Sequence, residues 1–387
     1  MPIRFLTAGE SHGKGVIVIL EGFPAHLPIS KNEINVDLSR RQLGYGRGGR
    51  MLIEKDQVEI LSGIRRGFTI GSPITLFIKN KDFENWEKIK TSEMTSEVQG
   101  NPLLRPRPGH ADLPGGLKYN HRDLRNILER ASARETTARV AAGAVAKKLL
   151  KCFGIFVQSY VTRLGKISGE ILIKKYNNLN RLADKSPVRM LNKKFEKAAM
   201  LQIDQAKRDG NTLGGVFEVV ITGVPFGLGS HVQWDRKLDG KIAQAIMSMQ
   251  AIKGIEIGLG FKNAQRFGSE VHDEIGYRKN KGFFHRTNHA GGIEGGISNG
   301  EPIVVRVAKK PISTLRKPLR SVNIETKEIV RAAYERSDIC ALPAASVIGE
   351  SICAWVIADV FLEKIGGDFI SEIEKRFKLY MKHIENY

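Results

Sequence analysis

The sequence has few cysteines and no long apolar runs, which argues against a disulfide-stabilised protein and against a transmembrane protein. Its three cysteines are too few and too far apart for a disulfide framework, and they indicate a reducing compartment. Its nine histidines show no zinc-motif spacing, so we expect no metal site. No stretch approaches the ~20 uninterrupted apolar residues of a transmembrane helix, and no charged-then-apolar leader opens the chain. We therefore expect a soluble, cytoplasmic protein with no membrane partner.

Acidic residues are also scarce relative to basic ones. The 387 residues include 61 Lys and Arg but only 41 Asp and Glu, so the net charge of +20 should attract anions. This excess is spread along the chain. A basic RNA-binding protein would explain the charge, but no row of aromatic residues and no known RNA-binding motif accompanies it, so we treat RNA binding as the weaker hypothesis. We expect no nucleic-acid partner. Four arginines crowd a glycine-rich loop in a way that suits a small phosphorylated or carboxylated ligand: Arg40, Arg41, Arg47 and Arg50.

A weak internal repeat relates the two ends of the chain. Three strand-and-turn patterns recur in the same order about 200–230 residues apart: residues 16–24 and 217–225, 59–63 and 256–260, and 71–78 and 300–307. Chance similarity between such short patterns is the alternative explanation. Because no linker divides the chain, we expect a single domain over residues 1–387 with two similar halves, roughly 1–150 and 200–345.

The distribution of apolar residues predicts an α+β fold. Runs of β-branched and apolar residues between Gly and Pro predict strands at 16–21, 58–62, 74–79, 155–167, 216–222, 254–259 and 302–309. Helices are expected from the Ser30–Glu33 capping box to Gly44, and over 126–151, 195–209, 236–249 and 345–365. Residues 326–336 fit either a helix or a strand, and residues 168–200 resemble a variable surface excursion. The alanine-rich segment 126–151 suits a helical layer sandwiched between antiparallel sheets.

Two glycine-rich motifs do not meet the requirements of nucleotide-binding loops. Residues 44–49 satisfy G-x-G-x-x-G, but a predicted helix precedes them and no acid follows at the expected distance. Residues 9–14 are one residue short of a phosphate loop and lack the hydroxyl that follows its lysine. Both dinucleotide and nucleoside-triphosphate binding are therefore disfavoured at these loops.

Three other segments combine groups that bind and protonate anions. Residues 7–13 place Ser11 and His12 on a glycine turn, although a histidine in a turn is often merely exposed. In residues 105–112, alternating prolines should stiffen the chain and project two arginines the same way, with His110 just beyond. Residues 129–143 carry Arg130 and Arg134. Both lie on one helix if the helix is continuous, or Arg130 precedes and Arg134 follows its N-terminal end if the helix begins at Ser132. An exposed helix with Arg–Glu pairs is the alternative for this third segment.

Taken together, these segments resemble the chorismate synthase family. The resemblance rests on residues 9–13, 107–112, 130–136 and 336–345, and extends through residues 233–237, 291–300 and 310–314 over essentially the whole chain. It implies a cytoplasmic homotetramer of the shikimate pathway that eliminates phosphate (anti-1,4) from 5-enolpyruvylshikimate 3-phosphate (EPSP) to give chorismate. It also implies a requirement for reduced FMN without net redox change, and reduction of the flavin either by NADPH on the enzyme or by an external flavin reductase.

The resemblance also implies roles for individual residues. Substrate would be bound by Ser11, Arg41, Arg47, Arg50, Arg107 and Arg134, and NADPH would meet Arg41 and Arg47. FMN would contact Arg130, Ala131, Ser132, Gln250, Ala251, Gly295, Lys310, Pro311, Ile312, Ser313, Thr314 and Arg336. His12 would protonate the departing phosphate, His110 would steady the anionic reduced flavin, and Asp338 would take up the proton that the flavin removes.

Overall fold

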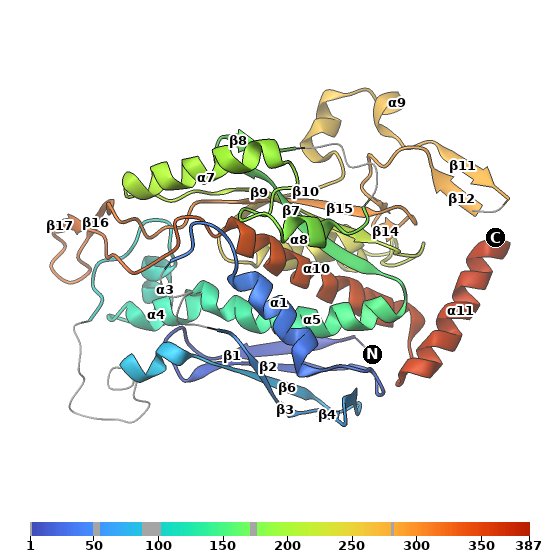
Figure 1. Cartoon of the computed structure of the whole chain (residues 1–387), viewed down its shortest axis with the longest axis horizontal. Helices are drawn as coiled ribbons and strands as arrows, with labels where there is room; N and C mark the ends of the chain where they lie inside the picture. Colours follow the sequence, from blue (N-terminus) through green and yellow to red (C-terminus); the bar gives the residue numbers. More distant parts are fainter. Residues whose placement is uncertain (1, 49–54, 87–101, 171–175, 280–281) are drawn as a thin grey trace.

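Two antiparallel sheets enclose a layer of helices (Figure 1). The computed structural model describes residues 2–48, 55–86, 102–170, 176–279 and 282–387. The first sheet has the order β1 (Arg4–Ala8), β2 (Gly15–Glu21), β6 (Ile74–Lys79) and β3 (Val58–Ser62). The second has the order β10 (Ile252–Ile257), β15 (Ile303–Lys309), β9 (Gly215–Thr222), β7 (Phe156–Leu164) and β8 (Ile167–Ser168). This architecture confirms the expected α+β class.

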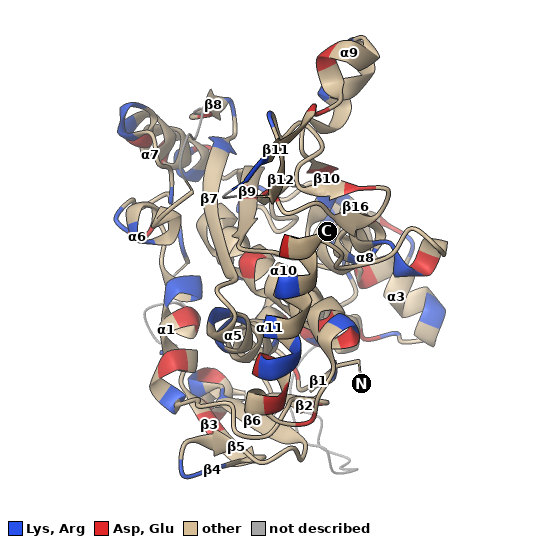
Figure 2. Cartoon of the chain, turned by 90° about the vertical axis from the view of Figure 1, so that its right-hand side faces the viewer, with Lys and Arg blue, Asp and Glu red and all other residues tan. Residues whose placement is uncertain are grey.

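The helical layer consists mainly of α1 (Lys31–Gln42), α5 (Thr136–Cys152), α8 (Leu238–Met247) and α10 (Leu342–Ile365). Helices α5 and α10 approach closely, because a Cβ at Gly143 would lie 2.4 Å from the Cβ of Ser351. Viewed end-on, α5 and α10 lie between the two sheets (Figure 2). Within the described residues, α10 is long and apolar enough to cross a membrane, but nearly all of it is buried in the fold. Its hydropathy therefore matches a helix covered by protein on several sides.

Shorter elements cover the edges and ends of these layers. The helical ones are η1 (Lys81–Asn85), α3 (Asp112–Tyr119), α4 (Arg125–Ala131), η2 (Ala133–Glu135), α6 (Leu179–Ala183), α7 (Lys193–Arg208), η3 (Trp234–Arg236), η4 (Gly260–Gln265), α9 (Gly268–Val271) and α11 (Ile370–Asn386). The short strands form four hairpins: β4–β5 (Ile64–Arg65, Phe68–Thr69), β11–β12 (Ile275–Arg278, Gly282–His285), β13–β14 (Ile293–Glu294, Ile297–Ser298) and β16–β17 (Arg320–Val322, Ile329–Arg331).

Most predicted elements are confirmed, but the longest predicted helix is not continuous. Ser132 adopts an extended conformation (φ −63°, ψ 143°), so the segment divides into α4, η2 and α5. Of the two alternatives for residues 326–336, the structure has a strand, β17. The interpretation of residues 168–200 as a surface excursion is wrong for its centre, where Leu179, Val188 and Arg189 are buried. Arg189 donates hydrogen bonds to Ser346 of α10 and Ser159 of β7, which ties this segment to the core.

The strand order of the two large sheets supports the proposed repeat. The recurring sequence patterns lie on β2, β3 and β6 in one sheet and on β9, β10 and β15 in the other. The order β1-β2-β6-β3 therefore corresponds to β7-β9-β15-β10, with antiparallel neighbours throughout. Gly22 and Gly223 occupy the same place after β2 and β9, and both have positive φ (+86° and +77°). The duplication itself remains a proposal.

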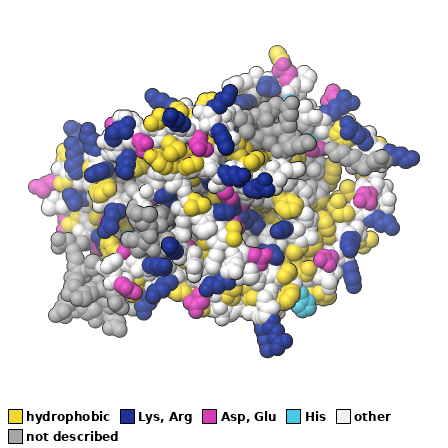
Figure 3. All heavy atoms as spheres, in the orientation of Figure 1, with side chains coloured by type: hydrophobic (Ala, Val, Ile, Leu, Met, Phe, Trp, Pro, Cys, Tyr) yellow, Lys and Arg dark blue, Asp and Glu magenta, His cyan; other side chains and the backbone are white. Residues whose placement is uncertain are grey.

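Basic side chains are distributed over the surface rather than gathered in one patch. Figure 3 shows Lys and Arg side chains over the whole visible face, interspersed with acidic and apolar ones. This distribution agrees with a charge excess spread along the chain. The groups that could bind anions are instead a small set of buried or half-buried arginines at one end of the helical layer.

Candidate active site

The turn that carries Ser11 and His12 is fixed by one buried amide. Asn80, which follows β6, donates hydrogen bonds from Nδ2 to the carbonyls of Glu10 (3.1 Å), Ser11 (3.2 Å) and Gly13 (2.7 Å). Gly9 begins the turn with φ +101°, and a Cβ there would lie 2.2 Å from the carbonyl oxygen of Gly15. The turn therefore requires glycine at this position and holds the two predicted site residues in one place.

The break at Ser132 brings the third predicted segment onto this turn. The Ser132 hydroxyl donates to the hydroxyl of Ser11 at 3.1 Å and also accepts from the backbone N–H of Arg134. The Arg134 guanidinium then reaches back to Asn80 Oδ1 (Nε, 2.7 Å). Two segments more than 100 residues apart thus share one hydrogen-bonded cluster.

Asp56 joins two of the predicted substrate arginines. It accepts hydrogen bonds from Arg134 (Nη1 to Oδ1, 2.5 Å) and Arg41 (Nη1 to Oδ2, 3.3 Å), and all three side chains are buried. Arg41 also donates to the Thr136 hydroxyl and to the carbonyl of Ala133. Burial lowers the pKa of Arg41 to about 10, so the guanidinium stays charged at neutral pH. No local motif marks Asp56, which lies in a loop 15 residues from Arg41 and 78 residues from Arg134 along the chain.

The glycine-rich loop places Arg47 against Asp338. Arg47 Nη1 lies 3.4 Å from Asp338 Oδ2, and the backbone N–H of Gly48 donates to Asp338 Oδ1 at 2.6 Å. The backbone N–H of Ile339 also donates to the carbonyl of Gly46, so the two segments run together. The structure thus pairs Asp338 with Arg47. Arg50 lies outside the described residues.

Arg107, His110 and Asp112 form a second compact cluster. Arg107 donates to Asp112 through Nε (2.8 Å) and Nη2 (3.0 Å), and His110 Nδ1 lies 2.6 Å from Asp112 Oδ1. Burial alone would raise the pKa of Asp112, but hydrogen bonds with His110 and Arg107 hold it below its ordinary value. The two arginines of this segment differ from expectation, because Arg107 is buried and Arg105 is exposed.

Thr314 connects this cluster to the rest of the site. Its hydroxyl accepts from Arg107 Nη1 at 3.0 Å, and its carbonyl accepts from the Ser337 hydroxyl, next to Asp338. We call the four buried or half-buried arginines with their three carboxylates the arginine network: Arg41, Arg47, Arg107 and Arg134, with Asp56, Asp112 and Asp338. Four guanidinium groups among three carboxylates leave a net positive charge, which favours anions.

The predicted flavin segments lie beside the arginine network. Lys310 donates from Nζ to the carbonyl of Gly109, and its backbone N–H donates to Ala251, which has a positive φ of +67°. Gln250 donates from Nε2 to Glu135 at 3.2 Å. Among the described residues, its buried Oε1 has no hydrogen-bond partner. A buried acceptor without a donor is costly, and it is an indication of a ligand.

Arg130 links α4 to β1 and the turn that follows it. It donates to the carbonyls of Gly9 (3.1 Å) and Thr7 (2.8 Å) and to the Thr7 hydroxyl (2.7 Å). The same hydroxyl donates to Glu135 Oε1 at 3.0 Å. Burial alone would raise the pKa of Glu135, but Arg139 and hydrogen bonds including that from Gln250 lower it. Glu135 therefore presents a carboxylate that links β1, α5 and Gln250.

Comparison with known proteins agrees with this geometry. Residues 3–362 match the family described as chorismate synthase. The chorismate synthase of Aquifex aeolicus (strain VF5) is 59% identical over 393 residues, covering 100% of this chain and 99% of that protein. That of Geobacter metallireducens (strain ATCC 53774 / DSM 7210 / GS-15) is 55% identical over 392 residues, with complete coverage of both.

The chain belongs to the chorismate synthase family. A solved structure, "Crystal Structure of Chorismate Synthase", matches with a TM-score of 0.79 and 47% identity, covering 100% of this chain and 99% of that one. The predicted family, fold and enzyme class, a carbon–oxygen lyase of the shikimate pathway, are thereby confirmed. The RNA-binding alternative finds no support in these relatives.

Not all the residues that the family resemblance assigned to FMN lie together in this chain. Gly295 lies in the β13–β14 turn beside the N-terminal end of α8, where the Leu238 N–H donates to Gly296. Gln250 follows the C-terminal end of the same ten-residue helix, about 15 Å away at 1.5 Å per residue. Arg336 is exposed on the loop before α10. In the predicted flavin segment 310–314, the carbonyl of Ile312 accepts from the hydroxyl of Thr212.

Proposed function

We propose that this chorismate synthase family member catalyses the anti-1,4-elimination of phosphate from EPSP to give chorismate, and that it requires reduced FMN. The observation that carries the proposal is the arginine network, in which Asp56 joins Arg41 to Arg134 and Thr314 joins Arg107 to Ser337, the residue before Asp338. The proposed substrate has one phosphate and two carboxylates, and FMN adds a second phosphate. A site for both needs several fixed cations, and guanidinium groups bind such oxygens well.

The carboxylates of the network would orient the arginines rather than neutralise the site. Asp112 fixes Arg107, and Asp56 fixes Arg134 and Arg41, so these forks lose little conformational entropy when an anion binds. Ser11 and Ser132 would add hydrogen bonds to the same ligand. Arg47, and Arg50 beyond the described residues, would approach it from the glycine-rich loop. Preorganised cations of this kind stabilise a leaving phosphate without moving.

The residues around Gln250 fit a flavin. The unpaired Gln250 Oε1 suits the imide N–H of an isoalloxazine ring. Lys310 and Arg130 bring cations to the same region, and the backbone and hydroxyl groups of the strap 310–314 suit a ribityl phosphate. When bound, reduced FMN supplies electron density to the ring from which phosphate departs, with no net redox change. Gly295 and Arg336 complete the proposed set, although Gly295 lies at the far end of α8.

Three titratable residues would manage the protons. His12 would give a proton to the departing phosphate oxygen, because its imidazole can act as a general acid and lies on the turn beside Ser11. His110, held by Asp112, would steady the anionic reduced flavin. Asp338, held by Gly48 and Arg47, would accept the proton removed from the substrate.

The remaining proposals concern partners and location. NADPH would meet Arg41 and Arg47 if the enzyme reduces its own flavin, and otherwise an external reductase supplies reduced FMN. We also propose a cytoplasmic homotetramer. Light scattering during size-exclusion chromatography tests the tetramer, and anaerobic NADPH oxidation in the presence of FMN tests the reductase activity.

The central experiment measures anaerobic phosphate release from EPSP with chemically reduced FMN and, separately, with oxidised FMN. We expect release only with the reduced cofactor, with chorismate absorbance rising in step. Substituting His12 or His110 by Ala should lower turnover about 10²–10⁴-fold, the usual range for general acid–base groups. Release with oxidised FMN at the same rate would contradict the cofactor requirement, and no release in either condition would contradict the proposed reaction.

A further inference from the structure

A buried glutamate meets the predicted proton donor through both of its oxygens. Glu129 lies in α4 and is only 3% exposed, although the sequence also allowed it to be a surface residue paired with arginine. Its Oε1 lies 2.9 Å from His12 Nδ1, and its Oε2 accepts from the His12 backbone N–H at 2.8 Å. The carbonyl of Glu129 also accepts from the backbone N–H of Ser11 at 3.0 Å. Glu129 thus holds both the turn and the ring.

This geometry fixes which ring nitrogen can exchange a proton with a ligand. An ionised carboxylate only accepts hydrogen bonds, so His12 Nδ1 must carry the hydrogen that points at Glu129. The other nitrogen, Nε2, is then the one whose proton can be lost and regained. Similar carboxylate–histidine pairs orient catalytic imidazoles in unrelated enzymes, so the arrangement has a known chemical use.

An aromatic ring restricts the remaining freedom of the imidazole. The Trp86 and His12 ring centroids are 4.2 Å apart with an interplanar angle of 31°. Trp86 is itself held, because its Nε1 donates to Asp82 (3.3 Å) and the Arg125 guanidinium lies 5.3 Å from its ring centroid. The hydrogen bond at Nδ1 and the stacked face together leave the imidazole little room to turn.

We propose that Glu129 is the positioning residue of a Glu129–His12 dyad that protonates the departing phosphate, with Trp86 fixing the plane of the ring. In this step the Nε2–H bond of the imidazolium breaks and an O–H bond forms on the phosphate as its C–O bond to the substrate breaks. His12 becomes neutral and keeps the hydrogen on Nδ1, which still donates to Glu129. The charge of Glu129 does not change. Solvent reprotonates Nε2 between turnovers. The inference rests on the role proposed for His12.

Glu129→Gln tests the dyad, because an amide has one acceptor oxygen where the carboxylate has two. In the variant one of these two oxygens becomes an NH2 donor, so either the His12 backbone N–H or its Nδ1–H faces a donor instead of an acceptor. We expect kcat for phosphate release to fall about 10–100-fold, with the KM for EPSP changed less than threefold. Glu84→Gln, at an exposed position of η1 near Trp86, is the matched control and should keep wild-type kinetics.

A double-mutant cycle separates positioning from simple structural support. If Glu129 acts through His12, adding Glu129→Gln to His12→Ala should cost less than a further threefold in kcat. Affinity for oxidised FMN, measured by flavin fluorescence, should be the same in all four proteins. Should the amide variant fail to fold, Glu129→Asp keeps the charge but shortens the reach, and the same cycle applies to it. Independent losses that multiply in the double variant would overturn the dyad.

Trp86 gives a second test through a conservative replacement. Trp86→Phe keeps an aromatic face over His12 and should retain at least a third of wild-type kcat, whereas Trp86→Ala should lose about tenfold. Equal losses in both variants would contradict the role of the stacked ring. If Glu129→Gln keeps the wild-type kcat while His12→Ala loses activity, only the dyad is refuted. If His12→Ala keeps full activity, the proposed role of His12 is refuted.

Discussion

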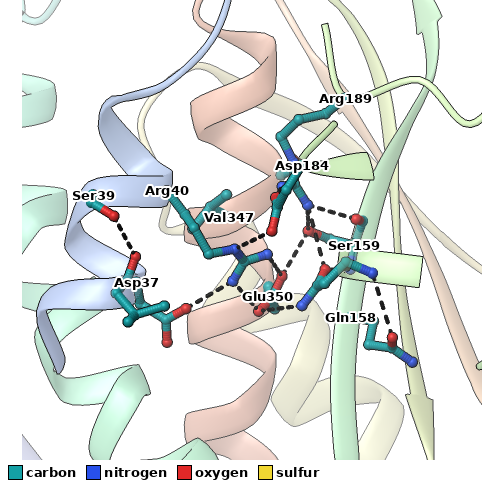
Figure 4. Close-up of polar contacts among 12 residues, drawn as sticks. Asp37, Ser39, Arg40, Gln158, Ser159, Asp184, Arg189, Val347 and Glu350 are labelled. Carbon is teal, nitrogen blue, oxygen red and sulfur yellow. Dashed lines mark hydrogen bonds and ion pairs between the residues drawn. The ribbon is translucent and has the colours of Figure 1, made fainter. Parts of the chain in front are cut away.

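Arg40 and Glu350 form a two-pronged ion pair in the middle of the helical layer (Figure 4). Arg40 Nη1 donates to Glu350 Oε1 at 2.8 Å, and Nη2 donates to Oε2 at 3.0 Å. Glu350 is completely buried in α10 and also accepts from Lys147 of α5 at 2.6 Å. The carboxylate therefore joins three helices. Because Arg41 follows Arg40 on α1, this pair also fixes the helix from which Arg41 reaches Asp56.

Replacing Glu350 by Gln should strongly destabilise the fold. The substitution removes the buried counter-charge that Arg40 and Lys147 share beside Arg189, and breaking a buried pair from one side costs about 3–5 kcal/mol. Urea unfolding followed by circular dichroism measures the loss. Glu363→Gln on the same helix removes only a half-exposed partner of Lys241 and should change the unfolding free energy by less than about 1 kcal/mol.

The contribution of Glu350 should also depend on pH. Burial alone would raise the pKa of Glu350, but Arg40 and Lys147 hold it well below the ordinary value of 4.5. A carboxyl group whose pKa is lowered by folding stabilises the protein fully above its unfolded pKa, and this contribution falls as the pH drops towards the folded pKa. The stability gap between wild type and Glu350→Gln should therefore be constant from pH 7 to about 5.5 and narrow below pH 4.5. A gap that widens on acidification would contradict this assignment.

The paired glycine turns after β2 and β9 predict a steric effect of Gly223→Ala. Gly223 has φ +77°, and a Cβ there would lie 2.1 Å from the carbonyl oxygen of Gly154. Gly154 has a similar φ of +73° but open space around its Cβ position, so Gly154→Ala is a control for backbone strain alone. We expect about 1 kcal/mol of destabilisation from Gly154→Ala and at least about 2 kcal/mol more from Gly223→Ala. Equal unfolding free energies in the two variants would show that the β9 turn accommodates the methyl group.

The strands and helices of the core could be predicted because their local patterns agree with the fold. β15 and β9 are rich in Val and Ile, and Ser30 and Glu33 form the capping box that their spacing predicted. The break at Ser132 was one of two alternatives, since alanines and arginines continue the helical pattern on both sides of it while serine is also a common N-cap residue. β1 was missed because it is short and at the edge of its sheet, with Leu6 largely exposed.

The candidate site was predictable in its basic groups but not in the residues that hold them. Histidines and arginines near glycine and proline were visible as local segments. The side chains of Asn80 and Glu129 contact partners 54 to 117 residues away, and Asp56 joins Arg41, 15 residues away, to Arg134, 78 residues away, so no local spacing marks them. Asp112 could have been found, because it lies two residues after His110 in the predicted segment 105–112. Such buried carboxylates and amides become visible only when the tertiary contacts are known.

Gln250→Leu should weaken FMN binding while leaving the fold intact. The substitution removes the unpaired Oε1 and one hydrogen bond to Glu135, in a side chain of similar size. Losing one buried hydrogen bond to a ligand costs about 1–1.5 kcal/mol, so we expect the Kd for FMN to rise about tenfold. Fluorescence titration measures the Kd, and Gln244→Leu on α8 is the control. An unchanged Kd would show that the Oε1 of Gln250 does not face the flavin.

Arg107→Lys should impair the enzyme much more than the same change at Arg105. The buried Arg107 binds Asp112 through Nε and Nη2 and Thr314 through Nη1, a planar pattern that an ammonium group cannot reproduce. Losing the fork leaves Asp112 with fewer donors and should raise the KM for EPSP about 10–100-fold, since hydrogen bonds to charged groups contribute about 1.5–3 kcal/mol. Arg105 is exposed two residues earlier in the same proline-rich segment, so Arg105→Lys preserves the charge and controls for the segment itself. Steady-state phosphate release under anaerobic conditions compares the two variants. Equal KM values would mean that charge alone, rather than the geometry of the guanidinium, matters at this position.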